Sequence, residues 1–355
     1  MISNDIKFQV QNSVPDFILE GVNSFFPKQL GPILKGKNTA IIYGSTGTDF
    51  TWWVKQLDLV SDDFDTVILY TSDVFLLRNN KNIFEHPTLT NKRLFLFYLG
   101  YENKKIKDSQ WEISWPEFYF NRSKTEKNIK PPGLSYKFSS LNSRASAHRL
   151  ILGYNLYKNN LLNQIMFTQN TIGGWWTNNY PAPDVVSTIP DFQSYINLLP
   201  IKYQDEITPT QPDLTNNHPA YNQAYCNIVT ETEAGDDVYQ TPNFNDTIEI
   251  ITEKSYKPFV SCQVPLFLAC KGHLRHLKNL GFEVFENLLP AGYDTMGVQD
   301  KISAIVEIVS RGGDFMENFY FSHLKEIEHN YELISSDKVE QLILNNIKNL
   351  LNPVK

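Results

Sequence analysis

Four residues that could bind phosphates or sugar hydroxyls lie close together, Thr252, Glu253, Lys254 and Lys257. They stand ahead of an apolar run that begins at Val264 and has the composition of a buried strand. A nucleoside diphosphate needs cations or helix N-terminal amides around its phosphates, and a carboxylate that accepts from its ribose hydroxyls. The cluster supplies these groups where a loop would enter a helix. Thr252 is also a good helix N-cap with Glu253 in the first turn, so a capping role is the alternative interpretation.

A second polar cluster comprises Asn142-Ser143-Arg144 and His148-Arg149, at another predicted strand-to-helix junction. Two arginines five positions apart could clamp a diphosphate, because a guanidinium makes paired hydrogen bonds to phosphate oxygens and keeps its charge. The alternative is a solvated first helical turn. Arginine there opposes the helix dipole, which favours the binding interpretation.

The segments around both clusters alternate between apolar runs of strand length and stretches of helical spacing. In the N-terminal half, a helix over 50–59 lies among strands predicted over 39–43, 65–70 and 93–99. In the second half, strands are predicted over 136–141, 165–168, 225–231, 264–270 and 282–285. Helices are predicted there over 150–159, 272–280, 299–310, 315–330 and 336–351. Strands that alternate with helices are typical of an α/β fold with parallel sheets.

The length of 355 residues exceeds the size at which one hydrophobic core usually keeps growing, so two domains are expected. A stretch rich in Lys, Asn and Pro over 103–133 separates the two α/β halves, and its later part is predicted to link them. The sequence therefore predicts an N-terminal domain over 1–133, a second domain over 134–300 and a helical tail over 301–355.

Composition argues against several classes of protein. With 41% hydrophobic and 20% charged residues, the chain has the make-up of an ordinary folded protein. A net charge of −7 argues against a protein that grips polyanions over its whole surface, although a local basic groove stays open. There is no secretory pattern and no apolar run near the ~18 residues that span a bilayer. The 3 cysteines lack metal-ligand spacing and indicate neither a zinc site nor a disulfide framework, so we expect a reduced, cytoplasmic protein. No cofactor is expected.

Two sequence blocks together resemble the donor-binding half of fucosyltransferase-like glycosyltransferases. They run over 138–149 and over 251–258, ahead of a Gln-Val-Pro run, in that family's order and at comparable separation. Between them, 227–232 is similar to the family's strand that ends in Phe-Glu-Asn. The resemblance covers about residues 136 to 290. It implies the GT-B arrangement of two facing Rossmann-like domains, with the donor in the C-terminal domain, the acceptor in the cleft and no metal.

The resemblance implies a role for each matching residue. The residues implied to hold the donor phosphates are Asn142, Arg144, Arg149, Lys254 and Lys257. Glu253 would accept from the ribose hydroxyls beside the N-cap residue Thr252, and Glu231 would lie near the sugar or ribose. Thr232 stands where the family has Asn, and Ser255-Tyr256-Lys257 replaces the family's usual continuation, so the identity of the sugar stays open.

Transfer of a sugar needs a base that takes the proton of the acceptor hydroxyl. In a single displacement, which inverts the anomeric centre, this base is a carboxylate that faces the donor from the N-terminal domain. Asp49 and Asp73 both follow predicted strands at their carboxyl ends, where open α/β sheets place their ligands. Each would also suit a helix cap or a turn, and Asp49 is ranked first.

These observations lead to one expected function and one rival function. The expectation is a metal-independent glycosyltransferase that moves a sugar from a nucleotide-diphosphate donor to a hydroxyl acceptor, either a glycan or modified DNA. The rival is a non-catalytic protein with a GT-B-like fold that binds a glycan or a nucleotide, or serves as a structural subunit. Turnover of a nucleotide sugar, as opposed to binding alone, would distinguish the two.

Overall fold

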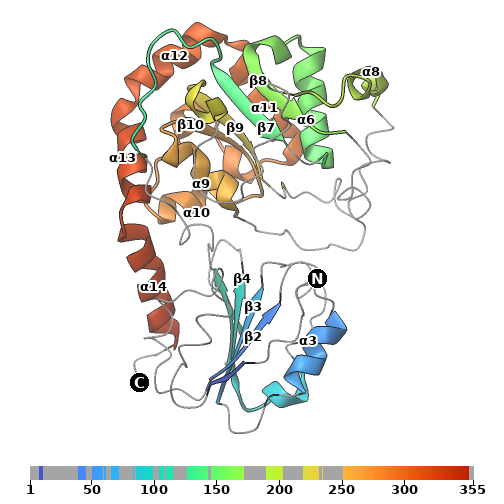
Figure 1. The fold of residues 1–355 in the computed structure, drawn as a ribbon, viewed down its shortest axis with the longest axis vertical. Helices are drawn as coiled ribbons and strands as arrows, with labels where there is room; N and C mark the ends of the chain where they lie inside the picture. Colours follow the sequence, from blue (N-terminus) through green and yellow to red (C-terminus); the bar gives the residue numbers. More distant parts are fainter. Residues whose placement is uncertain are drawn as a thin grey trace. The chain divides into compact units, whose positions relative to one another are not determined.

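The computed structural model describes residues 8–10, 39–44, 50–58, 60, 65–71, 83, 85–98, 104–107, 109–114, 126–142, 145–171, 189–202, 219–231, 234 and 251–351. The chain forms two compact units, Met1–Asn121 with Glu340–Lys355, and Arg122–Val339. Each unit has a sheet of its own, so each is described by itself (Figure 1).

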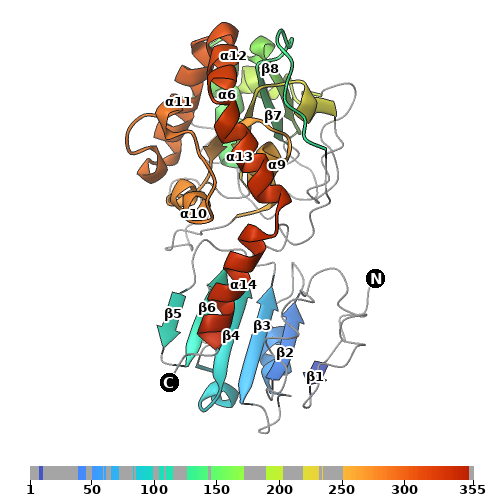
Figure 2. The ribbon, with the colours of Figure 1, turned by 90° about the vertical axis from the view of Figure 1, so that its left-hand side faces the viewer.

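The first unit is built on a 6-stranded sheet with the order β1-β2-β3-β4-β6-β5. Its strands are β1 (Phe8–Val10), β2 (Thr39–Gly44), β3 (Thr66–Thr71), β4 (Arg93–Tyr98), β5 (Lys104–Lys107) and β6 (Gln110–Ser114). The four strands β2, β3, β4 and β6 run parallel, whereas β1 and β5 pair antiparallel at the edges. Helix α3 (Phe50–Leu57) lies on one face and α14 (Lys338–Leu351), which joins this unit from Glu340 on, lies on the other (Figure 2).

At one edge of this sheet, two strands form in a lysine-rich stretch where the sequence predicts none. The sequence predicts no strand over 103–133, yet β5 and β6 occupy the early part of that stretch. Lysines in an edge strand discourage pairing with another chain, so a run of lysines is compatible with an antiparallel edge strand.

Central strands behave as expected, since Val67 and Ile68, which point to opposite faces of β3, are both buried.

The second unit has a 4-stranded sheet with the order β10-β9-β7-β8, in which all pairs are parallel. The strands are β7 (Phe138–Asn142), β8 (Ile165–Gln169), β9 (Cys226–Thr230) and β10 (Val264–Leu268). Every residue of these strands except Leu141 is buried, because helices cover both faces. The register pairs Asn142 with Gln169 and Leu268 with Thr230, so the carboxyl ends of the strands lie at one edge.

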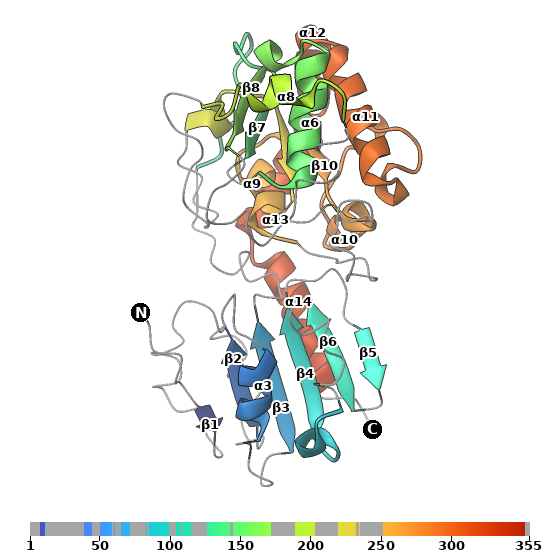
Figure 3. The same ribbon diagram turned by 90° about the vertical axis from the view of Figure 1, so that its right-hand side faces the viewer.

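Helices pack on the two faces of this sheet in pairs. Helix α6 (Ala147–Lys158) and α11 (Val298–Ser310) contact one another on one face, while α9 (Glu253–Val260) and α13 (Leu324–Ser335) contact one another on the opposite face (Figures 2 and 3). The other helices are α8 (Phe192–Ile196), α10 (His273–Asn279) and α12 (Gly313–Ser322). The chain leaves β7 through α6 and β9 through α9, so the strand order reverses between these neighbouring strands.

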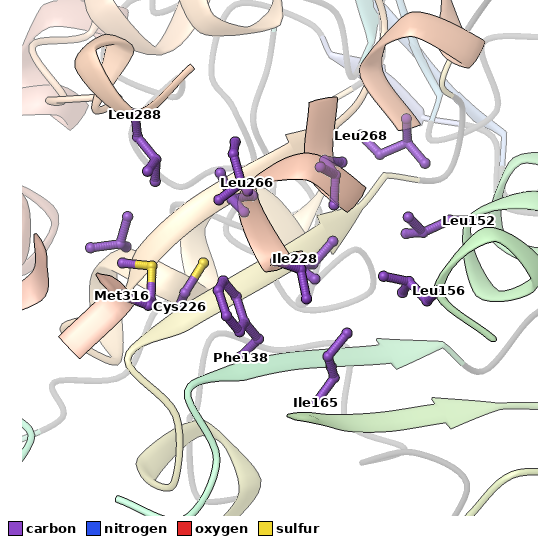
Figure 4. Packing of buried hydrophobic residues seen from close by; sticks show 14 of the residues in the cluster. Phe138, Leu152, Leu156, Ile165, Cys226, Ile228, Leu266, Leu268, Leu288 and Met316 are labelled. Atoms are coloured by element: carbon purple, nitrogen blue, oxygen red, sulfur yellow. The ribbon is translucent and has the colours of Figure 1, made fainter. Parts of the chain in front are cut away.

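The core of the second unit is one apolar cluster that spans the sheet and its helices. Strand residues Phe138, Ile228 and Leu266 pack with Leu152 of α6 and Met316 of α12 (Figure 4). All five side chains are almost completely buried. Burial of apolar surface on this scale is the main term that holds the strands and helices in place.

The predicted fold class is confirmed at the level of a mixed α/β fold with a parallel sheet flanked by helices and a helical C-terminal region. None of the helices that the structure describes is long and apolar enough to cross a membrane.

The strand predicted over 282–285 is wrong, because these residues form irregular chain. The apolar pattern there serves packing, since the ring of Phe282 stacks on that of Phe259 with centroids 4.4 Å apart.

The segment that leads into the second unit is held at the amino-terminal edge of its sheet by hydrogen bonds. The carboxylate of Glu317 in α12 accepts from Gly133 N–H at 2.7 Å and from Lys137 Nζ at 2.5 Å. The hydroxyl of Tyr225 lies 2.8 Å from the carbonyl oxygen of Pro131 and 3.0 Å from Glu317 Oε1. These donors, Lys137 foremost, lower the pKa of Glu317 to about 2.

This pKa shift predicts how the stability of the second unit responds to acid. A carboxyl group whose pKa is lowered by folding stabilises the protein above its unfolded pKa, near 4.5, and loses that contribution as the pH falls toward 2. Glu317→Gln should cost about 1–2 kcal/mol of unfolding free energy at pH 7, a value limited by solvent screening of a partly exposed pair. Urea unfolding of both proteins between pH 7 and pH 2 should show this difference shrinking below pH 5. A difference that stays constant over that range would contradict the prediction.

Helix α6, which carries the second polar cluster, is positioned by a close contact with α8. A Cβ atom added at Gly153 would lie 2.0 Å from the hydroxyl oxygen of Tyr195. The side chain of Tyr195 is fully buried, and within the described residues its hydroxyl has no hydrogen-bond partner. Glycine at 153 therefore permits the approach of α8 to α6.

Two substitutions test this contact in opposite directions. Tyr195→Phe should raise the unfolding free energy by about 1 kcal/mol, because a buried hydroxyl without a partner is removed. Gly153→Ala should lower it by about 1–3 kcal/mol through overpacking. Thermal and urea unfolding measure both changes. Stabilisation by Gly153→Ala, as expected for alanine in an unobstructed helix, would show that the contact is absent.

Candidate functional site

The carboxyl edge of the second sheet has the topology of a ligand site. Open α/β sheets bind ligands outside the carboxyl ends of the two strands between which the strand order reverses. Here these strands are β7 and β9, which end in Asn142 and Thr230, and Glu231 follows directly. The first turns of α6 and α9 follow these strands along the chain, and they carry His148 and Arg149 of one cluster and Glu253 and Lys254 of the other.

Glu231 provides a fully buried carboxylate at the N-terminus of α9. Its Oε1 accepts from Thr252 N–H at 3.0 Å, and its Oε2 accepts from Thr252 Oγ1 at 2.7 Å. Ser255 Oγ also donates to Oε1. Thr252 is the N-cap of α9, and its hydroxyl oxygen accepts from Lys254 N–H. The negative charge thus lies where the helix dipole favours an anion.

The backbone carbonyl of the same residue binds the first turn of α6. Arg149 Nη2 donates to the carbonyl oxygens of Thr230 and Glu231, both at 3.0 Å. His148 Nε2 lies 3.0 Å from the Glu231 carbonyl oxygen. Burial, with the charge of Arg149 nearby, lowers the pKa of His148 to about 3, so its imidazole is neutral and Nε2 carries the proton that it donates.

Glu231 therefore joins the two sequence clusters, one through its carbonyl and the other through its carboxylate. Arg149, implied by the resemblance to hold phosphates, is almost completely buried, and its Nη2 is directed at the end of β9. Asn142 is buried too. Its Oδ1 accepts from Thr230 Oγ1 and its Nδ2 donates to Ser140 Oγ at 3.1 Å, so it ties β7 to β9.

Lys254 is the most accessible member of the site, and it pairs with the largely buried Glu253. The Nζ atom of Lys254 lies 3.0 Å from Glu253 Oε1 and 3.3 Å from Thr252 Oγ1. Their side chains are 29% and 11% exposed, respectively. Lys257, one turn on, is buried with its Nζ 6.0 Å from the centre of the Tyr221 ring. Burial and the charge of Glu253 raise the pKa of Tyr221.

Three predicted site residues, Arg144, Asp49 and Asp73, lie outside the described residues. Within the described part of the chain, no group of three or more His, Cys, Asp and Glu side chains could hold a metal ion. Sequence analysis missed Ser255 and His273, whose side chains meet behind Glu231. No local signal in the sequence links His273 to α9, because the two residues are 18 positions apart in the chain.

Comparison with models of protein families, with curated proteins and with solved structures finds no match for this chain. Any function proposed for the site therefore depends on its geometry and chemistry.

Because Glu231 links the first turns of α6 and α9, a small change in its side chain should have a large effect on the stability of the protein. Glu231→Gln removes the charge at the N-terminus of α9 while it keeps the shape of the side chain, and should lower the unfolding free energy by about 2–3 kcal/mol. The matched control is Glu286→Gln, since Glu286 is exposed and pairs with Lys278 at 2.8 Å. That change should cost less than about 0.5 kcal/mol. Equal effects of the two substitutions in urea unfolding would show that Glu231 does not link the two helices.

Proposed function

We propose that this chain is a GT-B glycosyltransferase, similar to the fucosyltransferase-like family, that transfers a sugar from a nucleotide-diphosphate donor to a hydroxyl acceptor. The observation that carries the proposal is the hydrogen-bonded link from the first turn of α6 through Glu231 to the first turn of α9. This link gathers a carboxylate, cations and hydroxyls at the strand-order reversal of a parallel sheet, where such sheets bind nucleotides.

In this proposal the donor nucleotide binds over the start of α9. Glu253 accepts from the ribose hydroxyls, and Lys254 exchanges its contact with Glu253 for the diphosphate. A diphosphate carries more negative charge than one carboxylate, so the exchange is favourable. The positive charge of Lys254 then offsets the charge that develops on the leaving diphosphate, and no metal is required. Arg144, Arg149 and Lys257 add positive charge around the phosphates.

The acceptor half of the proposal concerns the first unit. Its sheet, with four parallel central strands and helices on both faces, is compatible with a Rossmann-like domain. Asp49 or Asp73 would take the proton from the acceptor hydroxyl in an inverting displacement. A glycan is the acceptor that the resemblance favours, and modified DNA is the alternative.

Donor binding gives the direct test. GDP, UDP, ADP, CMP and dTDP are screened by thermal shift, since a ligand that binds only the folded state raises the melting temperature. Calorimetry then gives Kd for the nucleotide that stabilises the protein most. Lys254→Ala should raise this Kd by about 10-fold or more, because a hydrogen bond to a charged group contributes on the order of 1.5–3 kcal/mol.

The matched control is Lys278→Ala, which removes a lysine from another helix-borne ion pair with a glutamate, 2.8 Å apart. It should leave Kd within about 2-fold of the wild type, since exposed pairs contribute little. If the wild type binds none of the five nucleotides, or if both lysine variants behave alike, the proposed site is wrong. Binding without hydrolysis or transfer of any matching nucleotide sugar would support the non-catalytic alternative.

A further inference from the structure

A second layer of buried polar groups lies behind Glu231. Ser255, in the first turn of α9, donates its hydroxyl proton to Glu231 Oε1, and its oxygen lies 2.9 Å from His273 Nε2. Glu231 and Ser255 have no exposed surface, and His273 is 1% exposed. The three groups form a chain that no solvent reaches, so it acts on a ligand only through the residues that it positions.

The hydrogen bonds of this chain have a fixed direction. Oxygen Oε1 of Glu231 is an acceptor, and the single proton of Ser255 is directed at it. The nitrogen beside Ser255 Oγ must then be a donor, so His273 carries its proton on Nε2. Burial, with His276 and Lys301 nearby, holds the pKa of His273 well below its usual value, so the ring is neutral.

Helix α10 and the end of β10 hold His273 in place. The carboxylate of Asp294 accepts from Leu274 N–H at 2.9 Å and from Arg275 N–H at 3.1 Å, and so caps the start of α10. The His273 ring packs on Phe267 of β10 with centroids 4.8 Å apart. Lys301 Nζ donates to the carbonyl of Ala269 at 2.9 Å, just after β10 ends. The donor to Ser255 is therefore anchored to the sheet.

We infer that Ser255 and His273 are positioning residues for the nucleotide site, which hold Glu231 and through it the first turn of α9. This inference rests on the proposed function. The carboxylate of Glu231 binds Thr252, and the next two residues along the chain are the proposed ribose and phosphate ligands. Without the Ser255 hydroxyl, Oε1 keeps the bond from Thr252 N–H but loses its second donor, and the first turn of α9 loses one of its hydrogen bonds to Glu231. Thr252 and the turn that follows it then shift relative to β9.

The test compares two buried serines on the same helix segment. Ser255→Ala breaks the chain, whereas Ser261→Ala removes a hydroxyl at the other end of α9 that donates to the Lys257 carbonyl at 2.7 Å. Both variants should lose similar thermal stability. Calorimetry with the best nucleotide of the panel should show Kd raised by about 10-fold for Ser255→Ala, in line with other residues that orient a binding group, and within about 2-fold for Ser261→Ala.

A second pair of variants keeps the test independent of whether Ser255→Ala folds. His273→Gln retains an N–H donor at the place of Nε2, and His273→Leu removes it. The glutamine variant should bind within about 3-fold of the wild type and the leucine variant about 10-fold more weakly. Nitrogen-15 spectra of the wild type should show a neutral His273 ring protonated on Nε2 between pH 5 and pH 8.

The outcomes separate the two proposals. If the wild type binds a nucleotide but Ser255→Ala and His273→Leu bind it equally well, the positioning role is wrong and the proposed function stands. A charged ring, or one protonated on Nδ1, likewise overturns the directed chain. If the wild type binds no nucleotide at all, the proposed function is wrong and the positioning role is rejected with it.

Discussion

The carboxyl edge of the second sheet depends on the burial of one carboxylate, that of Glu231. An ionisable group with no exposed surface is stable only where hydrogen-bond donors replace the water it has lost. The N–H and hydroxyl of Thr252 and the hydroxyl of Ser255 supply these donors, and the positive end of the α9 dipole adds to them. Because each donor belongs to the first turn of α9, satisfying the carboxylate also fixes that turn against the end of β9.

The carbonyl groups at the strand ends explain why several cations lie at the carboxyl edge of this sheet although some of them are buried. The carbonyls at the carboxyl end of a parallel sheet have few strand partners left, and a buried polar group needs one. Arg149 binds the carbonyls of Thr230 and Glu231, and Lys301 binds those of Ala269 and Cys270. A cation at such an edge therefore serves the fold when it is buried, and Lys254, which is partly exposed, is the better placed to meet a ligand.

The two edges of the second sheet have different tasks. The amino-terminal edge is closed by Glu317, Tyr225 and the segment over 126–137, which anchor the entry of the chain. The carboxyl edge carries the polar groups of β7, β9, α6 and α9. A ligand group held on rigid strands and helices keeps its geometry better than one held on a loop. The buried chain from His273 to Glu231 extends this rigidity behind the proposed nucleotide site.

The positions of most of the described strands and helices of the second unit can be predicted from the sequence, as can the polar residues that follow β7 and β9. Apolar runs of strand length, helical spacing and an N-cap threonine are local properties, so a window of sequence reveals them. Tertiary structure alone decided that Arg149 turns toward the end of β9 and that Ser255 meets His273, 18 positions away, at 2.9 Å. These contacts follow from the strand order β10-β9-β7-β8 and its register, which bring together carbonyls, helix ends and side chains that are distant in sequence. No local pattern encodes that order, because it results from burial of apolar surface over the whole unit.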